Sequence, residues 1–239
     1  MYMALCGLCL QVSAEHQRLP KAVQSSELAQ ARQLHKQGEY YAALQRLEPV
    51  ITVEHGGDSQ EEALWLANTL CEKFVRYNIL VKWVDNAFGD RTLEGEFRSA
   101  EPYLWLNNLG ANIRFDQVTA AYTYHYGFLE ILARKYPESS FVPAAKYYLI
   151  PREFNDRNQA EAWGKALTAY LDTHENPELP ERIWAQLDLA RIHDTLWELI
   201  SYPSDFSSGF TAGDAVGDRA YAATCRDIAL KNYLKVLES

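Results

Sequence analysis

Hydrophobic residues in this chain recur at intervals of three and four positions, the spacing that places side chains on one face of a helix. The pattern is clear over residues 25–51, where two apolar stripes are separated by Gly38-Glu39-Tyr40. The stripes consist of Ala31 and Leu34, then Ala43, Leu47 and Val50. The pattern predicts a helical hairpin. One hairpin cannot bury its apolar face alone, so we expect neighbouring hairpins to pack against it.

The same periodicity predicts helices along most of the remaining chain. They are expected at residues 60–84, 101–109, 117–135, 158–173, 180–200 and 218–237. Residues 85–100 are irregular, and residues 201–217 are expected to form a long loop rich in glycine and serine. The alternating aromatic run Tyr122, Tyr124, Tyr126 and Phe128 is assigned to two faces of a buried helix, because its flanks have helical spacing. The predicted fold class is therefore all-α.

The hairpin at residues 25–51 resembles a tetratricopeptide repeat. Gly38 is followed two residues later by an aromatic, Tyr40, and Ala43 and Leu47 stand where the family has Ala-x3-Phe. Glu27 and Gln30 depart from the pattern, because that family usually has Trp and Leu there. Two segments in the second half of the chain resemble each other. Pro143 and Pro180 each open a predicted helix, and their separation is close to the repeat length of helical hairpins.

The resemblance implies an architecture and a function. The architecture is a tetratricopeptide-like superhelix, or solenoid, as one domain over residues 15–239 with an irregular insertion near residues 85–115. The function is that of a non-catalytic adaptor or scaffold, which binds a protein or peptide in a concave groove. The groove-facing positions would be Ser25, Leu28, Arg32, His35 and Lys36. The turn at residues 136–140 also has a weak likeness to exported proteins of this family, of the outer-membrane assembly and Tol-Pal type.

The charge balance limits the class of partner. The chain of 239 residues has a net charge of −9 and a pI of about 5.2. Binding to nucleic acid or to anionic lipid requires a basic field, so both are disfavoured. Arg32, His35 and Lys36 form a local basic stripe on this acidic chain, which would orient an acidic or carboxylate-ended peptide.

The start of the chain favours export. Residues 2–10 are uncharged and mostly apolar, and Val12-Ser13-Ala14 fits the small-residue pattern of signal-peptidase cleavage. We therefore expect a signal peptide, truncated at its start, over residues 1–14 and a periplasmic location. The alternative is a cytoplasmic protein whose apolar N-terminal tail docks on the core. After residue 14 no apolar run is long enough to span a bilayer.

No cofactor, metal or catalytic motif is apparent in the sequence. The six histidines lack metal-ligand spacing, and no phosphate-binding or nucleophile motif occurs. Cys6 and Cys9 form an incidental C-x-x-C pair, and Cys71 and Cys225 are expected to be buried, unpaired thiols on helices.

Two other interpretations remain open. Glu94, Glu96 and Glu101 lie near Tyr103 and Trp105, and paired carboxylates beside aromatic rings suit a helical enzyme acting on a saccharide or envelope substrate. The second interpretation is that the chain is a structural subunit of a larger complex. In the binding interpretation, Trp105 is a candidate surface anchor, together with Asn108 and Arg114.

Overall fold

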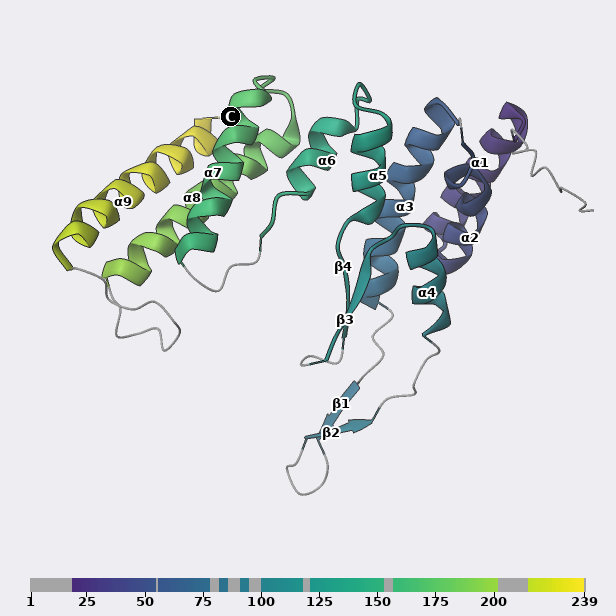
Figure 1. The fold of residues 1–239 in the computed structure, drawn as a ribbon, viewed down its shortest axis with the longest axis horizontal. Helices are drawn as coiled ribbons and strands as arrows, with labels where there is room; N and C mark the ends of the chain where they lie inside the picture. Colours follow the sequence, from purple (N-terminus) through teal and green to yellow (C-terminus); the bar gives the residue numbers. More distant parts are fainter. Residues whose placement is uncertain are drawn as a thin grey trace, which may run out of the picture. The chain divides into compact units, whose positions relative to one another are not determined.

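The computed structural model describes most of the chain as helices joined by short connections (Figure 1). The described residues are 19–54, 56–77, 82–85, 91–94, 100–117, 121–152, 157–201 and 215–238. The predicted signal peptide, Cys6, Cys9 and Glu96 lie outside them, as does most of the predicted loop at 201–217. Contacts divide the chain into two compact units, residues 1–125 and 126–239. That the two form a single domain stays a prediction.

The first unit begins with three packed helices: α1 (Lys21–Lys36), α2 (Tyr40–Ile51) and α3 (Asp58–Tyr77). Each helix contacts the next, and α1 also contacts α3. Gly38 has φ of +81°, a left-handed conformation that glycine adopts without steric cost, and it lets the chain reverse between α1 and α2. The predicted hairpin is thus confirmed.

The core of these three helices consists of the small and branched residues that the periodicity indicated. Its fully buried members include Ala31, Ala43, Leu47, Val50, Leu64, Ala67, Leu70 and Cys71. The hairpin was predicted from residue 25, whereas α1 begins at Lys21. Pro20, whose carbonyl accepts hydrogen bonds from the N–H groups of Val23 and Gln24, directly precedes the helix.

Two short β-hairpins and one helix complete the first unit. Strand β1 (Lys82–Asp85) pairs with β2 (Arg91–Glu94), and β3 (Ile113–Asp116) pairs with β4 (Ala121–Tyr124), both antiparallel. Helix α4 (Glu101–Asn108) lies between them in sequence, close to the helix predicted at residues 101–109, and Pro102 stands in its first turn. The predicted helix at residues 60–84 was too long, since α3 ends at Tyr77 and β1 follows.

The helix predicted at residues 117–135 is wrong in its first half. Tyr122 and Tyr124 lie on β4, where an alternation of period two is the natural spacing and aromatic residues are favoured. Tyr126 then adopts a left-handed conformation with φ of +57°, directly before α5 (Gly127–Lys135). The aromatic run therefore spans a strand, a turn and a helix rather than two faces of one helix.

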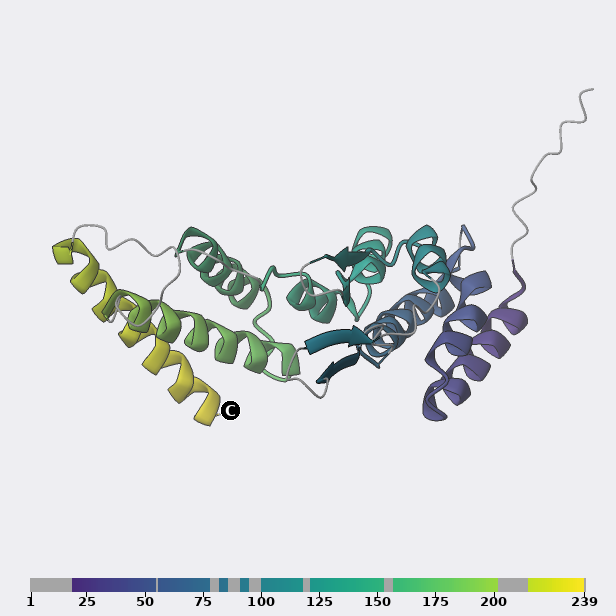
Figure 2. The ribbon, with the colours of Figure 1, turned by 90° about the horizontal axis from the view of Figure 1, so that it is seen from below.

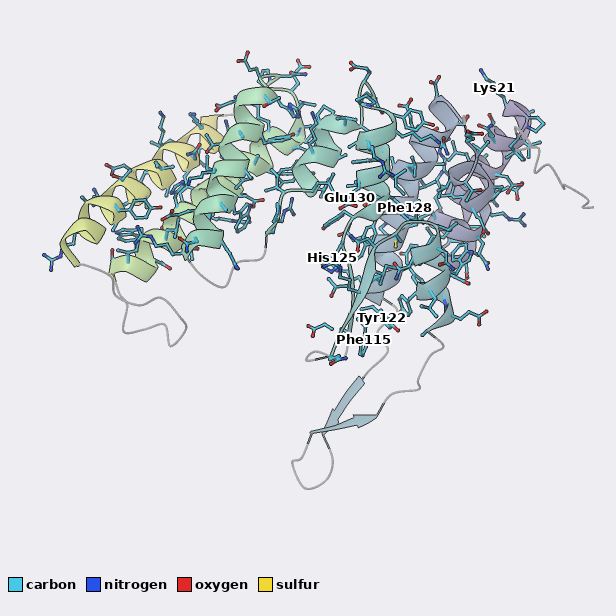
Figure 3. All side chains as sticks on the ribbon, in the orientation of Figure 1. Lys21, Phe115, Tyr122, His125, Phe128 and Glu130 are labelled. Atoms are coloured by element: carbon cyan, nitrogen blue, oxygen red, sulfur yellow. The ribbon has the colours of Figure 1, made fainter. Side chains whose placement is uncertain are left out.

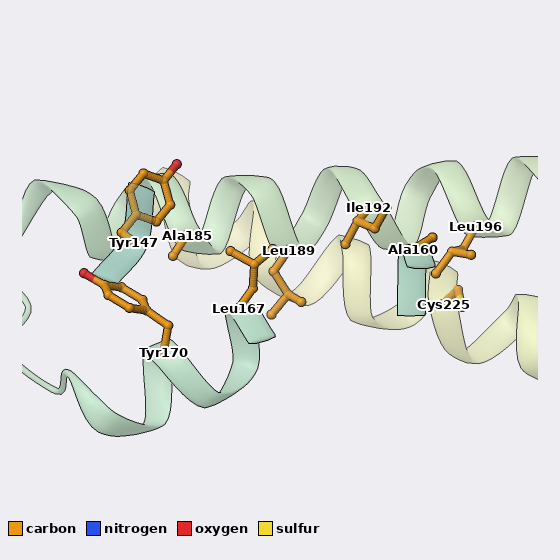
Figure 4. Close-up of a cluster of buried hydrophobic side chains, with 9 residues drawn as sticks. All are labelled: Tyr147, Ala160, Leu167, Tyr170, Ala185, Leu189, Ile192, Leu196 and Cys225. Carbon is orange, nitrogen blue, oxygen red and sulfur yellow. The ribbon is translucent and has the colours of Figure 1, made fainter. Parts of the chain in front are cut away.

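The described part of the second unit consists of five helices: α5, α6 (Val142–Tyr148), α7 (Arg157–Thr173), α8 (Pro180–Ser201) and α9 (Ala215–Glu238). Helix α8 is its centre, because it contacts α6, α7 and α9, and Figure 2 shows α9 crossing it obliquely. Figure 4 shows the buried cluster that joins them: Tyr147, Ala160, Leu167, Tyr170, Ala185, Leu189, Ile192, Leu196 and Cys225. Within the described ranges, no helix is both long and apolar enough to cross a membrane.

Candidate functional site

The predicted basic stripe on α1 faces α3. Arg32 forms an ion pair with Glu62, and Lys73 Nζ lies 2.8 Å from His35 Nε2. The same ammonium lies 5.8 Å from the centre of the Tyr40 ring. We call Arg32, His35, Lys36, Glu62 and Lys73 the α1–α3 face. It has three side chains that are cationic at neutral pH and one carboxylate, which leaves a positive excess.

The contact between His35 and Lys73 favours the neutral form of His35. Partial burial and then the charge of Lys73 lower the pKa of His35 from its usual value of 6.5. His35 is therefore neutral at pH 7, and its Nε2 accepts a hydrogen bond from the Lys73 ammonium. An ammonium has three donors, so Lys73 retains hydrogens for a further acceptor. The contacts with His35 and with the Tyr40 ring thus hold Lys73 in place on the face.

One predicted position does not belong to this face. Leu28 was expected to face a groove, but it is only 4% exposed and lies in the core of the helices. Sequence analysis also missed Glu62 and Lys73, which lie on another helix. No spacing rule joins residues on α1 with residues on α3, so only the packing of the two helices brings these side chains together.

Trp105 packs against α2 and does not stand alone on the surface. Its Nε1 donates to Glu48 Oε1 at 3.3 Å, and its ring meets that of Tyr41 edge to face at 5.4 Å. Asn108 is exposed at the end of α4, and Arg114 is exposed on β3, where its Nε donates to Asn112 Oδ1 at 3.3 Å. The predicted site residues thus fall into two groups. Arg32, His35 and Lys36 lie together, whereas Trp105 is held by other partners.

A row of aromatic rings connects these helices with the β3–β4 hairpin. Tyr103 on α4 stacks on Tyr122 at a centroid distance of 3.8 Å, and Tyr122 contacts Phe115 at 5.1 Å. Figure 3 shows Tyr122 and Phe115 on this hairpin. Phe115 is 50% exposed, so the row ends at the surface. Because these rings pack through tertiary contacts, helix periodicity alone misassigned them.

The carboxylates of the enzyme hypothesis are not brought together by any described contact. Glu101 is exposed at the first turn of α4, and the side chains of Glu94 and Glu96 lie outside what the structure describes. Tyr103, expected beside a substrate, is buried at 2% exposure. Its ring is therefore a core residue and does not offer a sugar-stacking surface.

No three His, Cys, Asp or Glu side chains among the described residues are placed to hold a metal ion. Cys71 and Cys225 are buried as predicted, and both thiols are free. Burial raises the pKa of Cys225, with Tyr221 and Arg157 partly opposing this, so the thiol is protonated at neutral pH.

Comparison with known protein families, with curated proteins and with solved structures gives no match for this chain.

Proposed function

We propose that this chain is a non-catalytic, tetratricopeptide-like adaptor that binds an acidic or carboxylate-ended protein segment on its α1–α3 face. The observation that carries the proposal is the cationic cluster formed by two helices, with Lys73 held between His35 and the Tyr40 ring. Helices α1 and α3 would be the first helices of successive hairpins, and they contact each other directly. In helical-repeat proteins such helices line the concave binding surface.

The charge distribution of the chain favours binding of a small anion at the α1–α3 face but does not favour binding of nucleic acid. The whole chain has a net charge of −9, so a long polyanion is repelled beyond the face. Within the face, Glu62 neutralises Arg32, and Lys36 and Lys73 provide the excess charge. A single carboxylate or a short acidic segment is the ligand that matches this distribution.

A fluorescein-labelled peptide with three glutamates and a free carboxyl terminus is a suitable probe, measured by fluorescence anisotropy. The double substitution Arg32→Ala with Lys36→Ala should weaken its binding about five- to thirtyfold, since about 0.5–1 kcal/mol is lost per exposed charge contact. The remaining binding should depend less on salt. Stability should change by no more than about 0.5 kcal/mol, because both side chains are exposed.

Arg46→Ala is the matched control. Arg46 is an exposed arginine of α2 that approaches Glu27 and lies outside the α1–α3 face. Its removal takes away one positive charge, half of what the double substitution removes, and should leave binding of the acidic peptide unchanged. A second control is the amidated peptide with glutamines in place of glutamates, which should not bind. Equal affinity of the double variant and the parent chain would disprove the proposed site.

Export is proposed on separate grounds, namely the uncharged apolar start and the Val12-Ser13-Ala14 segment. The mature chain should begin at or near Glu15. N-terminal sequencing of the native protein tests this. Recovery of an intact Met1 from the cytoplasm would contradict it.

A further inference from the structure

The second unit contains a cleft of about 450 Å³ that is separate from the α1–α3 face. One wall is α7, which contributes Glu161, Lys165 and Asp172. His193 of α8 and Tyr221 of α9 also line it. Helices α7 and α9 both pack on α8, and the cleft lies where side chains of all three meet. Its volume is in the range of small-ligand sites.

Gly164 determines how His193 reaches the cleft. This glycine lies in the interior of α7 and is buried, so α7 presents bare backbone at that point. A Cβ added to Gly164 would lie 3.5 Å from His193 Nε2, in ordinary van der Waals contact. The imidazole of His193 therefore lies against the backbone of α7. Any side chain larger than that of glycine at residue 164 would fill the space beside the His193 ring.

At one end of the cleft, the negative charge of Glu161 is already neutralised by Arg157. Arg157 Nε donates to Glu161 Oε1 at 2.8 Å, and the Arg157 guanidinium lies 4.4 Å from the centre of the Tyr221 ring. Burial opposes ionisation of Glu161, but the hydrogen bonds from Arg157 and Tyr221 outweigh it and hold the pKa of Glu161 below its usual value. This carboxylate is satisfied by its neighbours and is not available to a ligand.

The remaining polar groups of the cleft are one buried imidazole nitrogen and two exposed charges. His193 Nδ1 is buried and has no hydrogen-bond partner among the described residues. Lys165 and Asp172 are exposed, and the charge of Lys165 also helps to lower the pKa of Glu161, one helical turn away. Seven residues separate them along α7, which corresponds to about 10 Å at the rise of a helix. The cleft therefore presents one positive and one negative group about 10 Å apart.

We propose that this cleft binds a short zwitterionic peptide of about three residues, whose extended length is about 10 Å. Its terminal carboxylate lies at Lys165 and His193, and its terminal ammonium lies at Asp172. A ligand with a single charge leaves one of these groups unmatched, and a ligand of uniform charge is repelled at one end. A neutral imidazole adds a hydrogen bond to the carboxylate without a second charge.

The test uses the full chain and trialanine, with binding followed by the amide NMR signals of the protein. Trialanine should give saturable shifts at Gly164 and His193. N-acetylated trialanine and trialanine amide should each bind about two- to fivefold more weakly, the value of one exposed ion pair. Equal binding of the free and the blocked peptides, or the absence of saturable shifts, would overturn the proposal.

Substitutions assign each end of the peptide. Lys165→Gln should remove the preference for a free carboxylate and keep the preference for a free ammonium. Asp172→Asn should do the reverse. The controls Lys231→Gln and Asp227→Asn change exposed residues of α9 that do not line the cleft, and they should keep both preferences. If the two cleft variants retained both preferences as the controls do, the assignment would be wrong.

This proposal does not depend on the α1–α3 face. The variant with Arg32→Ala and Lys36→Ala should bind trialanine like the parent chain. Gly164→Ala should weaken trialanine binding without affecting the acidic glutamate peptide, because it fills the cleft beside His193. Failure of either site can thus be recognised without reference to the other.

Discussion

The two units differ in how they satisfy buried polar groups. In the first unit, Gln60 is 1% exposed, yet its Nε2 donates to Ile51 O and Val53 O and its Oε1 accepts from Gly56 N. Asn68 Oδ1 likewise accepts from the Tyr124 hydroxyl at 3.0 Å. Gln24 is the exception, since its Oε1 has no partner among the described residues.

In the second unit, several buried polar atoms have no hydrogen-bond partner among the described residues. They include Arg152 Nε and Nη2, Tyr170 Oη, His174 Nε2 and His193 Nδ1. Most buried polar groups in native proteins are hydrogen-bonded, because an unpaired one costs about 1–3 kcal/mol. The first unit uses its polar core to fix turns between helices. In the second unit, His193 lines the cleft, whereas Arg152, Tyr170 and His174 lie outside its lining.

The largest expected effect in this comparison is that of Gln60→Ala. It removes three hydrogen bonds made by a buried side chain, so the free energy of unfolding should fall by about 2–4 kcal/mol. Urea denaturation measures this. Gln30→Ala is the control, because exposed Gln30 donates only to Ser26 Oγ at 3.3 Å. It should change stability by no more than about 0.5 kcal/mol. A similar small loss for Gln60→Ala would remove the contrast between the units.

A matched pair of Tyr→Phe substitutions tests the same contrast directly. Tyr124→Phe takes a donor from buried Asn68 and should destabilise the protein by about 1–2 kcal/mol. Tyr170→Phe removes a buried hydroxyl without a described partner, so it should be neutral or should stabilise by up to about 1 kcal/mol. Burial raises the pKa of Tyr170 to about 12, so no ionised form is lost at neutral pH. Equal losses from both substitutions would show that Tyr170 has a partner in solution.

Two glycines provide a smaller comparison. Gly164→Ala should stabilise the second unit by about 0.5–1 kcal/mol, because alanine favours a helix interior and the new Cβ makes only ordinary contacts. Gly38→Ala should destabilise the first unit by about 1 kcal/mol, since residue 38 has φ of +81°. Thermal unfolding of the two variants measures both changes. The same sign for both would contradict the structure at one of these positions.

The last comparison concerns pH. Burial lowers the pKa of both His174 and His193 in the second unit, with nearby Lys146 and Arg182 adding to the effect at His174 and Glu161 opposing it at His193. Between the lowered folded value and the usual 6.5, the unfolded chain binds more protons than the folded chain. The free energy of unfolding should therefore fall as the pH drops below about 6.5.

His193→Gln should reduce this fall, as measured by urea denaturation between about pH 7.5 and about pH 5.5. His35→Gln, in the first unit, should act in the same direction, because burial and Lys73 lower the pKa of His35 as well. A His193→Gln variant with the same pH dependence as the parent chain would show that His193 is not buried in its neutral form.

The sequence by itself determined where most helices lie. The predicted helices at 101–109, 158–173, 180–200 and 218–237 agree with α4, α7, α8 and α9 to within a few residues. Apolar spacing and proline placement are local properties, and helix formation depends largely on them. The basic character of Arg32, His35 and Lys36 was also visible in one helix.

Only the tertiary structure decided which side chains meet. The alternating Tyr122 and Tyr124 became a strand because a hairpin with β3 and stacking on Tyr103 outweigh the helical flanks. Lys73 joined His35, and Tyr221 joined Glu161, across helices far apart in the chain. Helix periodicity acts over one turn, whereas a binding surface depends on contacts between elements, and those contacts are determined by how whole helices pack.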